Sequence, residues 1–180
     1  VGVESIITSD IETIKKADKY LLPGVGSFDH GINSLKNAPF FETLEKEVLE
    51  NKKPILGICL GMQLLTNSSE EGKEKGLGWI DAQTIKFDLE DKSLSIPHMG
   101  WNKTNPTNTN DVFKNLEDNR FYFVHSYHVV CNNEKNILAS SYYGQTFTCS
   151  IYKENIYGVQ FHPEKSHKFG MQLLKNFGEM

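Results

Sequence analysis

The pattern of hydrophobic and polar residues divides the chain into two halves of different character. In the first half, short apolar runs alternate with stretches whose apolar residues recur at helical spacing. These patterns predict strands at 1–8, 19–28 and 54–59 and helices at 9–19, 31–52 and 60–68. Pro39 is expected to break the second helical stretch into two helices. Strands that are apolar throughout and separated by helices are typical of a parallel sheet covered on both faces.

The second half consists of short β-rich segments separated by turn residues. They lie at 82–88, 93–99, 120–130, 136–143, 146–154 and 156–162. Residues 102–111 form the only linker-like stretch, and 165–180 have the pattern of an amphipathic helix. We therefore predict an α/β fold: a three-layer sandwich around a mixed, largely parallel central sheet whose later strands are partly antiparallel.

Length and composition fit one globular domain. The chain has 180 residues, which is enough for one sizeable core but a tight fit for two domains. Hydrophobic residues make up 38% of it, and no tract is of low complexity. We therefore predict a single domain over residues 1–180.

Charge and cysteine content exclude several classes of function. The net charge is -4, and the charged runs 45–53 and 68–76 mix both signs, which favours solvated faces over a nucleic-acid surface. No apolar run approaches the roughly 18 residues that span a bilayer, and no signal peptide is visible. The three cysteines lack the spacing of a disulfide framework or a zinc site. We expect no metal, no cofactor, no nucleic-acid or membrane partner, and a cytoplasmic location.

A cysteine stands where the strand at 54–59 passes into a helix. In the sequence Gly-Ile-Cys-Leu-Gly, at 57–61, the glycines allow a tight turn that exposes the sulfur of Cys59 above the sheet, as in a nucleophile elbow. The helix N-terminus favours the thiolate, and the Leu60 N–H is placed to donate to an oxyanion. Most free cysteines are small buried hydrophobes, so this motif alone leaves both interpretations open. For Cys131 and Cys149, which lack such a frame, we expect the buried role.

A second motif supplies the partners that a thiolate nucleophile needs. His162 follows the strand predicted at 156–162, and Glu164 comes two residues later. Both can project from one loop toward the edge of the sheet that carries Cys59. A lone His-x-Glu would favour a surface loop, but two strand-end motifs together favour a catalytic triad. We therefore predict Cys59 as nucleophile, His162 as base and Glu164 as the residue that orients the imidazole.

The sequence resembles a known family. The stretches GICLGMQLL (57–65) and GVQFHPEKS (158–166) resemble the class I glutamine amidotransferases, which release ammonia from glutamine through a cysteine thioester. The stretches at 21–28, 97–102 and 121–127 are similar to the glutaminase subunits of imidazole glycerol phosphate synthase, of the histidine pathway. The likeness covers essentially the whole chain.

The resemblance assigns further residues. It implies that His162 acts as both base and acid. It also implies that Gly24, Val25 and Gly26 complete the oxyanion hole together with the Leu60 N–H. In this subfamily the oxyanion strand is thought to need a peptide flip. Val25 is β-branched, whereas related enzymes usually carry glycine at this position. This difference fits an oxyanion hole that stays inactive until it is triggered.

The resemblance also implies contacts for the substrate and for a partner. Gln63 and Glu71 would hold the α-amino and α-carboxylate end of glutamine, and Ser126 and Tyr127 would contact the same molecule. The face toward the partner, near the ammonia gate, would carry Trp101, Tyr122 and Lys165. Aromatic residues at strand spacing are otherwise most often core or edge packing. The remaining histidines are expected on the surface or at caps (His30, His128 and His167) or as supports of the site (His98 and His125).

The implied function is that of a glutaminase subunit. It would pass ammonia to a barrel-type cyclase subunit in a heterodimer that makes imidazole glycerol phosphate and AICAR. The chain shows no P-loop and no dinucleotide-binding motif, so the acceptor chemistry belongs to another chain. Three alternatives remain: a paralogue that feeds a sugar amidotransferase of surface-polysaccharide synthesis, a catalytically dead scaffold, and a cysteine peptidase.

The family normally opens with one more strand and a helix, which carry an Asp-Tyr-Gly-type turn. This sequence begins after that point, at Val1. We expect a segment with the missing strand and helix to precede Val1. Without it, the neighbouring strand should show unpaired backbone groups.

Overall fold

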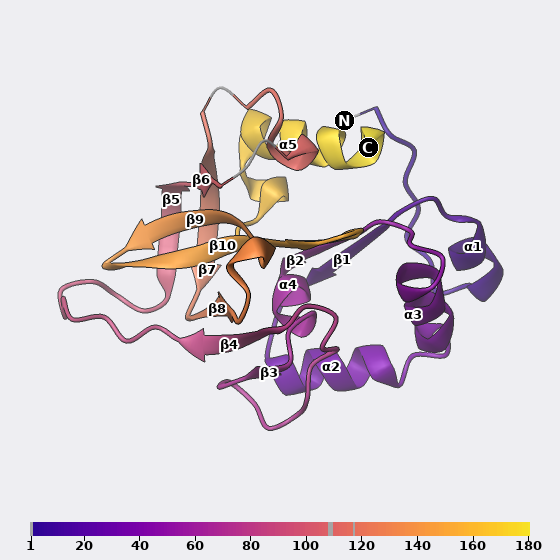
Figure 1. Ribbon diagram of the computed structural model, residues 1–180, viewed down its shortest axis with the longest axis horizontal. Coiled ribbons are helices and arrows are strands. Elements are labelled where there is room, and N and C mark those ends of the chain that lie inside the picture. The colour runs from indigo at the N-terminus through magenta and orange to yellow at the C-terminus, as the bar shows by residue number, and fades with distance from the viewer. Residues whose placement is uncertain (1, 108–109, 117) are drawn as a thin grey trace.

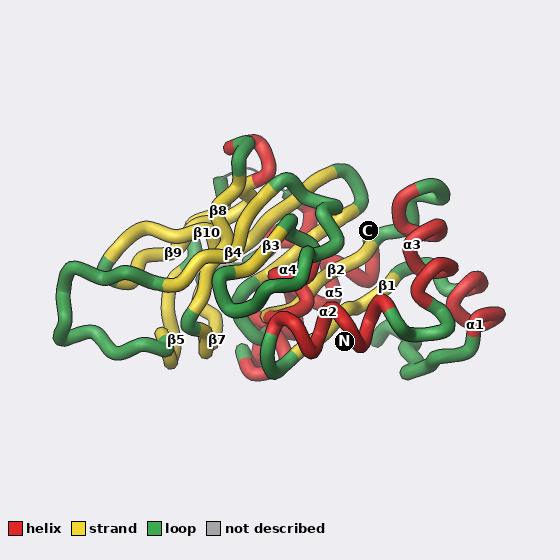
Figure 2. The backbone as a smooth tube through the Cα atoms, turned by 90° about the horizontal axis from the view of Figure 1, so that it is seen from below, coloured by secondary structure: helices red, strands yellow, loops and turns green. Residues whose placement is uncertain are grey.

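A curved sheet runs through the centre of the molecule, with helices on both of its faces (Figure 1). The computed structural model describes residues 2–107, 110–116 and 118–180, and in these parts nine strands form the main sheet. Their order is β1-β2-β11-β10-β8-β4-β3, with β9 also pairing β10 and β6 pairing β9. A second sheet of β5 and β7 runs down from the main sheet in the view of Figure 2.

The strands and helices have the following bounds. The strands are β1 Tyr20–Gly24, β2 Ile55–Cys59, β3 Ser68–Ser69, β4 Ala82–Lys86, β5 His98–Lys103, β6 Asn105–Pro106, β7 Arg120–His125, β8 Tyr127–Cys131, β9 Ile137–Tyr143, β10 Gln145–Lys153 and β11 Ile156–Val159. The helices are α1 Ile11–Lys16, α2 Phe28–Lys36, α3 Phe41–Leu49, α4 Leu60–Leu64 and α5 His167–Glu179, and the short 3₁₀ helices are η1 Asp111–Phe113, η2 Glu134–Asn136 and η3 Pro163–Lys165. No helix in the described residues is long and apolar enough to cross a membrane.

Strand β2 occupies the middle of the parallel part of the sheet, between β1 and β11. Ile55 packs into the core under α1, α2, α3 and α4, whereas Leu56 and Ile58 pack into the opposite core, which includes α5. Both faces of this strand are therefore buried, which explains its uninterrupted apolar run. The predicted three-layer α/β fold with a mixed sheet is confirmed. The sheet is less parallel than predicted: β1–β2, β2–β11 and β3–β4 are parallel, whereas the other described pairs of the main sheet are antiparallel, because the β-rich second half forms hairpins and meanders.

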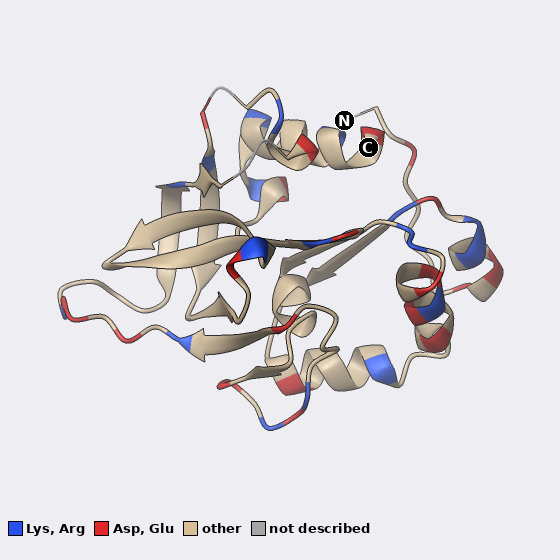
Figure 3. Ribbon diagram, viewed as in Figure 1, with Lys and Arg blue, Asp and Glu red and all other residues tan. Residues whose placement is uncertain are grey.

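Most predicted helices are confirmed, with corrected bounds. Asp10 caps α1 by accepting the Thr13 N–H at 2.8 Å, and Pro39 separates α2 from α3. Helix α4 ends at Leu64, four residues before the predicted end at 68, because the chain turns there toward β3. Both signs of charge interleave along α1 and α3 (Figure 3), as expected for solvated faces.

The predicted strand over 1–8 is wrong for residues 2–8, and Val1 lies outside the described residues. Residues 2–8 form no strand, since no described strand lies beside them, and Ile6 and Ile7 stay exposed. Strand β1 ends the sheet, and its outer edge pairs with no described strand. Strand β1 is therefore less buried than its apolar sequence predicts.

The second half contains three further corrections. The strand predicted at 93–99 starts only at His98. The stretch 102–111 is less linker-like than predicted, because β5 extends into it and β6 pairs with β9; residues 108 and 109 lie outside the described residues. The run 120–130 breaks at Ser126, where the chain leaves β7, which pairs with β5, and enters β8 in the main sheet.

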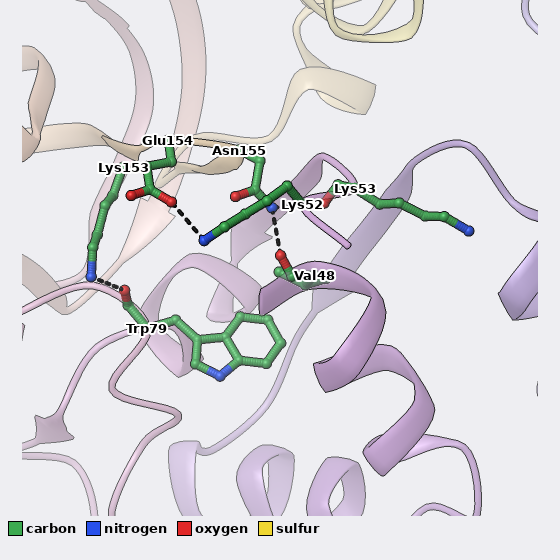
Figure 4. Close-up of polar contacts among 7 residues, drawn as sticks. All are labelled: Val48, Lys52, Lys53, Trp79, Lys153, Glu154 and Asn155. Atoms are coloured by element: carbon green, nitrogen blue, oxygen red, sulfur yellow. Dashed lines mark hydrogen bonds and ion pairs between the residues drawn. The ribbon is translucent and has the colours of Figure 1, made fainter. Parts of the chain in front are cut away.

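The turn between β10 and β11 is tied to the loop before β2 (Figure 4). The side chain of Asn155 donates to the carbonyl oxygens of Val48, at 2.8 Å, and Lys53, at 2.9 Å. Lys52 forms an ion pair with Glu154 at 2.7 Å. These contacts join β2 and β11 where both begin, so the two strands deliver the residues that follow them to the same far edge of the sheet.

Candidate active site

Cys59 lies at a sharp turn between β2 and α4. Its φ of 54° and ψ of -111° are strained for a residue with a side chain. A Cβ on Gly57 would lie 2.6 Å from the Gly61 carbonyl oxygen, and a Cβ on Gly61 would lie 1.8 Å from that of Leu22. The two glycines are therefore required by close backbone contacts, and the predicted tight turn is confirmed. Cys59 is half-buried, however, and less exposed than predicted.

His162 comes from the other central strand, just beyond the end of β11. Its Nδ1 lies 2.7 Å from Oε1 of Glu164. Because a carboxylate accepts, Nδ1 carries the proton in this pair, and in a neutral imidazole the lone pair is then on Nε2. Nε2 is buried and has no hydrogen-bond partner among the described residues. The Tyr122 carbonyl oxygen accepts the His162 N–H at 2.9 Å and so fixes the turn.

A pocket of about 290 Å³ brings most of the predicted site residues together. Its lining includes Val25, Gly26, Cys59, Leu60, Gln63, Glu71, Ser126, Tyr127, His162 and Lys165. Glu164 contacts His162 from outside the lining, and Gly24 lies against Leu60 and Gly61, where an added Cβ would come within 3.1 Å of both. No cluster of three metal-ligating side chains occurs in the described part of the chain.

Burial dominates the electrostatics of Cys59. It raises the pKa of the thiol to about 11, against smaller lowering effects of the Leu60 N–H, Lys165 and Gln160. Glu164 raises the same pKa further. The thiol is therefore neutral at pH 7 in this arrangement. Cys131 and Cys149 do not line the pocket, and Cys149 is buried as predicted, whereas Cys131 is only half-buried.

Two of the predicted substrate ligands already have protein partners. Oε2 of Glu71 accepts the N–H of Phe28, the first residue of α2, at 2.8 Å. An anion is favourable there, because the first N–H groups of a helix lack intrahelical partners. Nε2 of Gln63 donates to Oε1 of Gln160 at 3.0 Å. The bond between Glu71 and Phe28 ties the loop that carries Glu71 to the segment that carries Val25 and Gly26.

A second imidazole lines the pocket, but both of its ring nitrogens are engaged. Nδ1 of His125 lies 2.7 Å from the Tyr127 carbonyl oxygen, which can only accept, so this nitrogen carries the proton. Its Nε2 then accepts from Nδ1 of His98 at 3.0 Å. Burial lowers the pKa of His125 to about 3 and that of His98 to about 4, so both are neutral. Only His162, of the two imidazoles in the lining, presents a free nitrogen.

The other histidine predictions have mixed outcomes. His30 is exposed, and His167 is exposed at the start of α5, as predicted. The prediction for His128 is wrong: it is buried, because β8 lies between β4 and β10 and its ring lies against Phe87.

The residues predicted for the partner face lie beside the pocket and not in its lining, apart from Lys165. Trp101 and Tyr122 are cross-strand neighbours on β5 and β7, with ring centroids 6.3 Å apart. Trp101 also stacks on His167 at 5.5 Å and remains 46% exposed. This aromatic surface adjoins the turn of His162 through the backbone of Tyr122.

The sequence prediction missed Val124 and Gln160. Val124 lines the pocket, and Gln160 contacts both Cys59 and Gln63. The signal for Gln160 was a polar residue inside an apolar strand-end run, where the side chain must find a buried partner. Val124 gave no signal, since its pattern is that of any strand residue.

Known proteins similar to this chain match it along nearly its whole length. A family model, Glutamine amidotransferase class-I, matches residues 3–180. The chain is 57% identical over 178 residues to the imidazole glycerol phosphate synthase subunit HisH 2 of Methanococcus maripaludis, covering 98% of this chain and 88% of that protein. It is 46% identical over 181 residues to HisH 2 of Pseudomonas aeruginosa, covering 100% and 89%.

Solved structures show the same fold at lower identity. A glutamine amidotransferase crystal structure matches with a TM-score of 0.73 and 15% identity, covering 98% of this chain and 88% of that one. The structure of PurLQS from Thermotoga maritima matches with a TM-score of 0.61 and 19% identity, covering 87% of this chain and 77% of that one.

Proposed function

The chain belongs to the class I glutamine amidotransferase family, and from this premise we propose that it is the glutaminase subunit of an imidazole glycerol phosphate synthase in histidine biosynthesis. It forms one amidotransferase domain, works in the cytoplasm, and supplies ammonia to a barrel-type cyclase subunit. The relatives named HisH support the pathway and the subunit role. The observation that carries the chemistry is the strained Cys59 in one pocket with His162, whose Nε2 has no hydrogen-bond partner in the described chain.

The proposed reaction proceeds through a thioester. The Cys59 thiol gives its proton to Nε2 of His162, and the sulfur attacks the side-chain carbonyl carbon of glutamine. The carbonyl oxygen becomes an oxyanion, which accepts from the Leu60 N–H and from the segment Gly24–Gly26. His162 returns the proton to the amide nitrogen, ammonia leaves, and a γ-glutamyl thioester remains. Water that is deprotonated by His162 then releases glutamate and the thiol.

The substrate's α-amino and α-carboxylate groups would bind at Gln63, Glu71, Ser126 and Tyr127. All four line the pocket, which supports this assignment. Binding of the α-amino group to Glu71 would compete with its bond to the Phe28 N–H.

We further propose that the isolated subunit is held in an inactive state. The neutral thiol of Cys59 and the 81% exposed Val25 at the pocket mouth support a site that is completed by a partner. Loss of one oxyanion donor costs roughly 3 to 4 kcal/mol of barrier, so an incomplete hole suppresses idle hydrolysis. The partner would dock over Trp101, Tyr122 and Lys165 and receive ammonia before bulk water can protonate it.

The test compares the isolated chain, the complex with the cyclase subunit, and the complex that carries Cys59→Ala. Glutamine hydrolysis should be slow in the isolated chain and rise in the complex when the cyclase ligand is bound. Cys59→Ala should abolish synthesis from glutamine and leave synthesis from added ammonia unchanged. Loss of both activities would refute the division of labour, and vigorous hydrolysis by the isolated chain would refute the inactive state. Association with a sugar-modifying synthase instead would refute the histidine pathway.

A further inference from the structure

Gln160 is a fully buried polar side chain with no role in the reaction described above; its exposed fraction is 0%. The parallel register pairs Ile58 with Val159, so Gln160 is placed beside Cys59 where the two strands end. Its Nε2 lies 3.8 Å from Sγ of Cys59. A buried amide in contact with the sulfur requires an explanation, because burial of a polar group is costly unless its hydrogen bonds are made.

A chain of hydrogen bonds fixes which end of the amide faces the sulfur. The Tyr127 carbonyl oxygen can only accept, so His125 donates to it at 2.7 Å and Nε2 of Gln63 donates to it at 3.5 Å. The same Nε2 of Gln63 donates to Oε1 of Gln160 at 3.0 Å. With Oε1 engaged in this way, Gln160 presents its Nε2 donor to Cys59.

We propose that Gln160 is a catalytic residue that donates a hydrogen bond to the sulfur of Cys59 and favours its ionised form. A hydrogen bond to an anion is shorter and stronger than one to a neutral group, so the contact tightens when the thiol loses its proton. The Leu60 N–H also lowers the pKa of this thiol. Through Oε1, Gln160 also joins the nucleophile to Gln63, a proposed ligand of glutamine. The consequence for catalysis rests on the proposed function, whereas the contact with the sulfur does not.

The charged and titratable groups around the sulfur have opposing effects on the ionisation of the thiol. They come from the segment after β11, from the break between β7 and β8, and from the loop after β3. They are His162, Glu164, Lys165, His125, Tyr127 and Glu71. Glu164 opposes ionisation and Lys165 favours it, and His125 is neutral. A neutral amide donor therefore favours the thiolate without adding charge to the pocket.

The experiment measures alkylation of Cys59 by iodoacetamide between about pH 7 and 9 in the full chain, without partner or glutamine. The modified peptide is quantified by mass spectrometry, which separates Cys59 from the other two cysteines. Gln160→Met keeps the length of the side chain and removes the donor. Loss of one hydrogen bond to a charged group should raise the pKa of Cys59 by about one unit, so alkylation slows about tenfold.

A matched control and a second variant separate hydrogen bonding from packing. Gln145→Met removes an amide that lies 3.1 Å from Nε2 of His128, outside the pocket, and should leave the alkylation rate of Cys59 unchanged. Gln160→Glu keeps the shape but aims an acceptor at the sulfur, so it should slow alkylation more than Gln160→Met does. Wild-type rates in both Gln160 variants, or equal slowing in the Gln145 control, would overturn the inference.

A measurement on the unsubstituted sequence covers the case in which the Gln160 variants do not fold. The side-chain amide resonances of Gln160 should shift in NMR spectra when Cys59 is alkylated, and an unchanged signal would overturn the proposal. The outcome is independent of the proposed function. If the Gln160 variants slow alkylation as expected but the complex makes no product from glutamine, the proposed function alone is refuted. If the complex makes product from glutamine but the Gln160 variants are alkylated at the wild-type rate, the role of Gln160 alone is refuted.

Discussion

At the scale of single residues, the pocket holds two imidazoles in different bonding states. His125 is bonded through both ring nitrogens, and His162 through one. The difference comes from their partners. The two ring nitrogens of His125 are bonded to the Tyr127 carbonyl oxygen and to His98, whereas the ring of His162 is bonded, among the described residues, only to the carboxylate of Glu164. This bonding state, and not the residue type, makes His162 the base of the proposed mechanism.

The neutral His98 and His125 should make the protein sensitive to mild acid. Their pKa values in the folded state, about 4 and about 3, lie below the value of about 6.5 in the unfolded chain. Between about pH 6.5 and 4 the unfolded chain binds more protons, so the free energy of unfolding should fall as the pH falls. Urea titrations between pH 7 and 5 measure this slope.

The control for this prediction is an exposed histidine. The double variant His98→Gln and His125→Gln should flatten the slope between pH 7 and 5, whereas His30→Gln should leave it unchanged, because His30 is exposed. A slope that the double variant retains in full would contradict the assignment of acid sensitivity to this pair.

At the scale of elements, the sequence predicted what depends on neighbouring residues. The elbow at Cys59 follows from glycines two positions away, and the break at Pro39 from the ring of proline itself. Burial of His128 and the contacts of Gln160 depend on which strands become neighbours, and no local pattern contains that information. The apolar run 1–8 has strand character, but a strand forms only beside a partner, and residues 2–8 have none in the described structure.

The elbow makes a sharp prediction about two glycines. In Gly61→Ala the new Cβ would meet the backbone oxygen of Leu22, so β1 and α4 must separate, and the free energy of unfolding should fall by about 3 kcal/mol or more. Gly31→Ala in α2 is the matched control. Its Cβ meets the end of the Leu60 side chain, at 2.9 Å, and that of Leu64, at 3.5 Å, and its nearest contacts include no backbone atom. Alanine also favours helix, so the change should stay within about 1 kcal/mol.

Chemical denaturation of both glycine variants gives the comparison. Equal stability of Gly61→Ala and the wild type would show that the backbone contact between β1 and α4 is not required, and the physical explanation of the motif would then be wrong.

At the scale of the whole molecule, the site arises from two segments about a hundred positions apart in the chain. Strands β2 and β11 are joined at their starts by Asn155 and its partners (Figure 4). The segments that follow their far ends deliver Cys59 and His162 to one pocket. The aromatic residues of β5 and β7 lie next to that pocket, on the side that we assign to the partner. In the proposed function, one edge of the sheet thus combines nucleophile, base and docking surface.

The most direct test of the account is covalent labelling by a chloroketone analogue of glutamine, read by intact mass and peptide mapping. One adduct per chain should form, on Cys59; excess glutamine should prevent it, and Cys59→Ala should remove it. An adduct on Cys131 or Cys149, or labelling of Cys59 that glutamine does not slow, would contradict the assignment of this pocket as a glutaminase site.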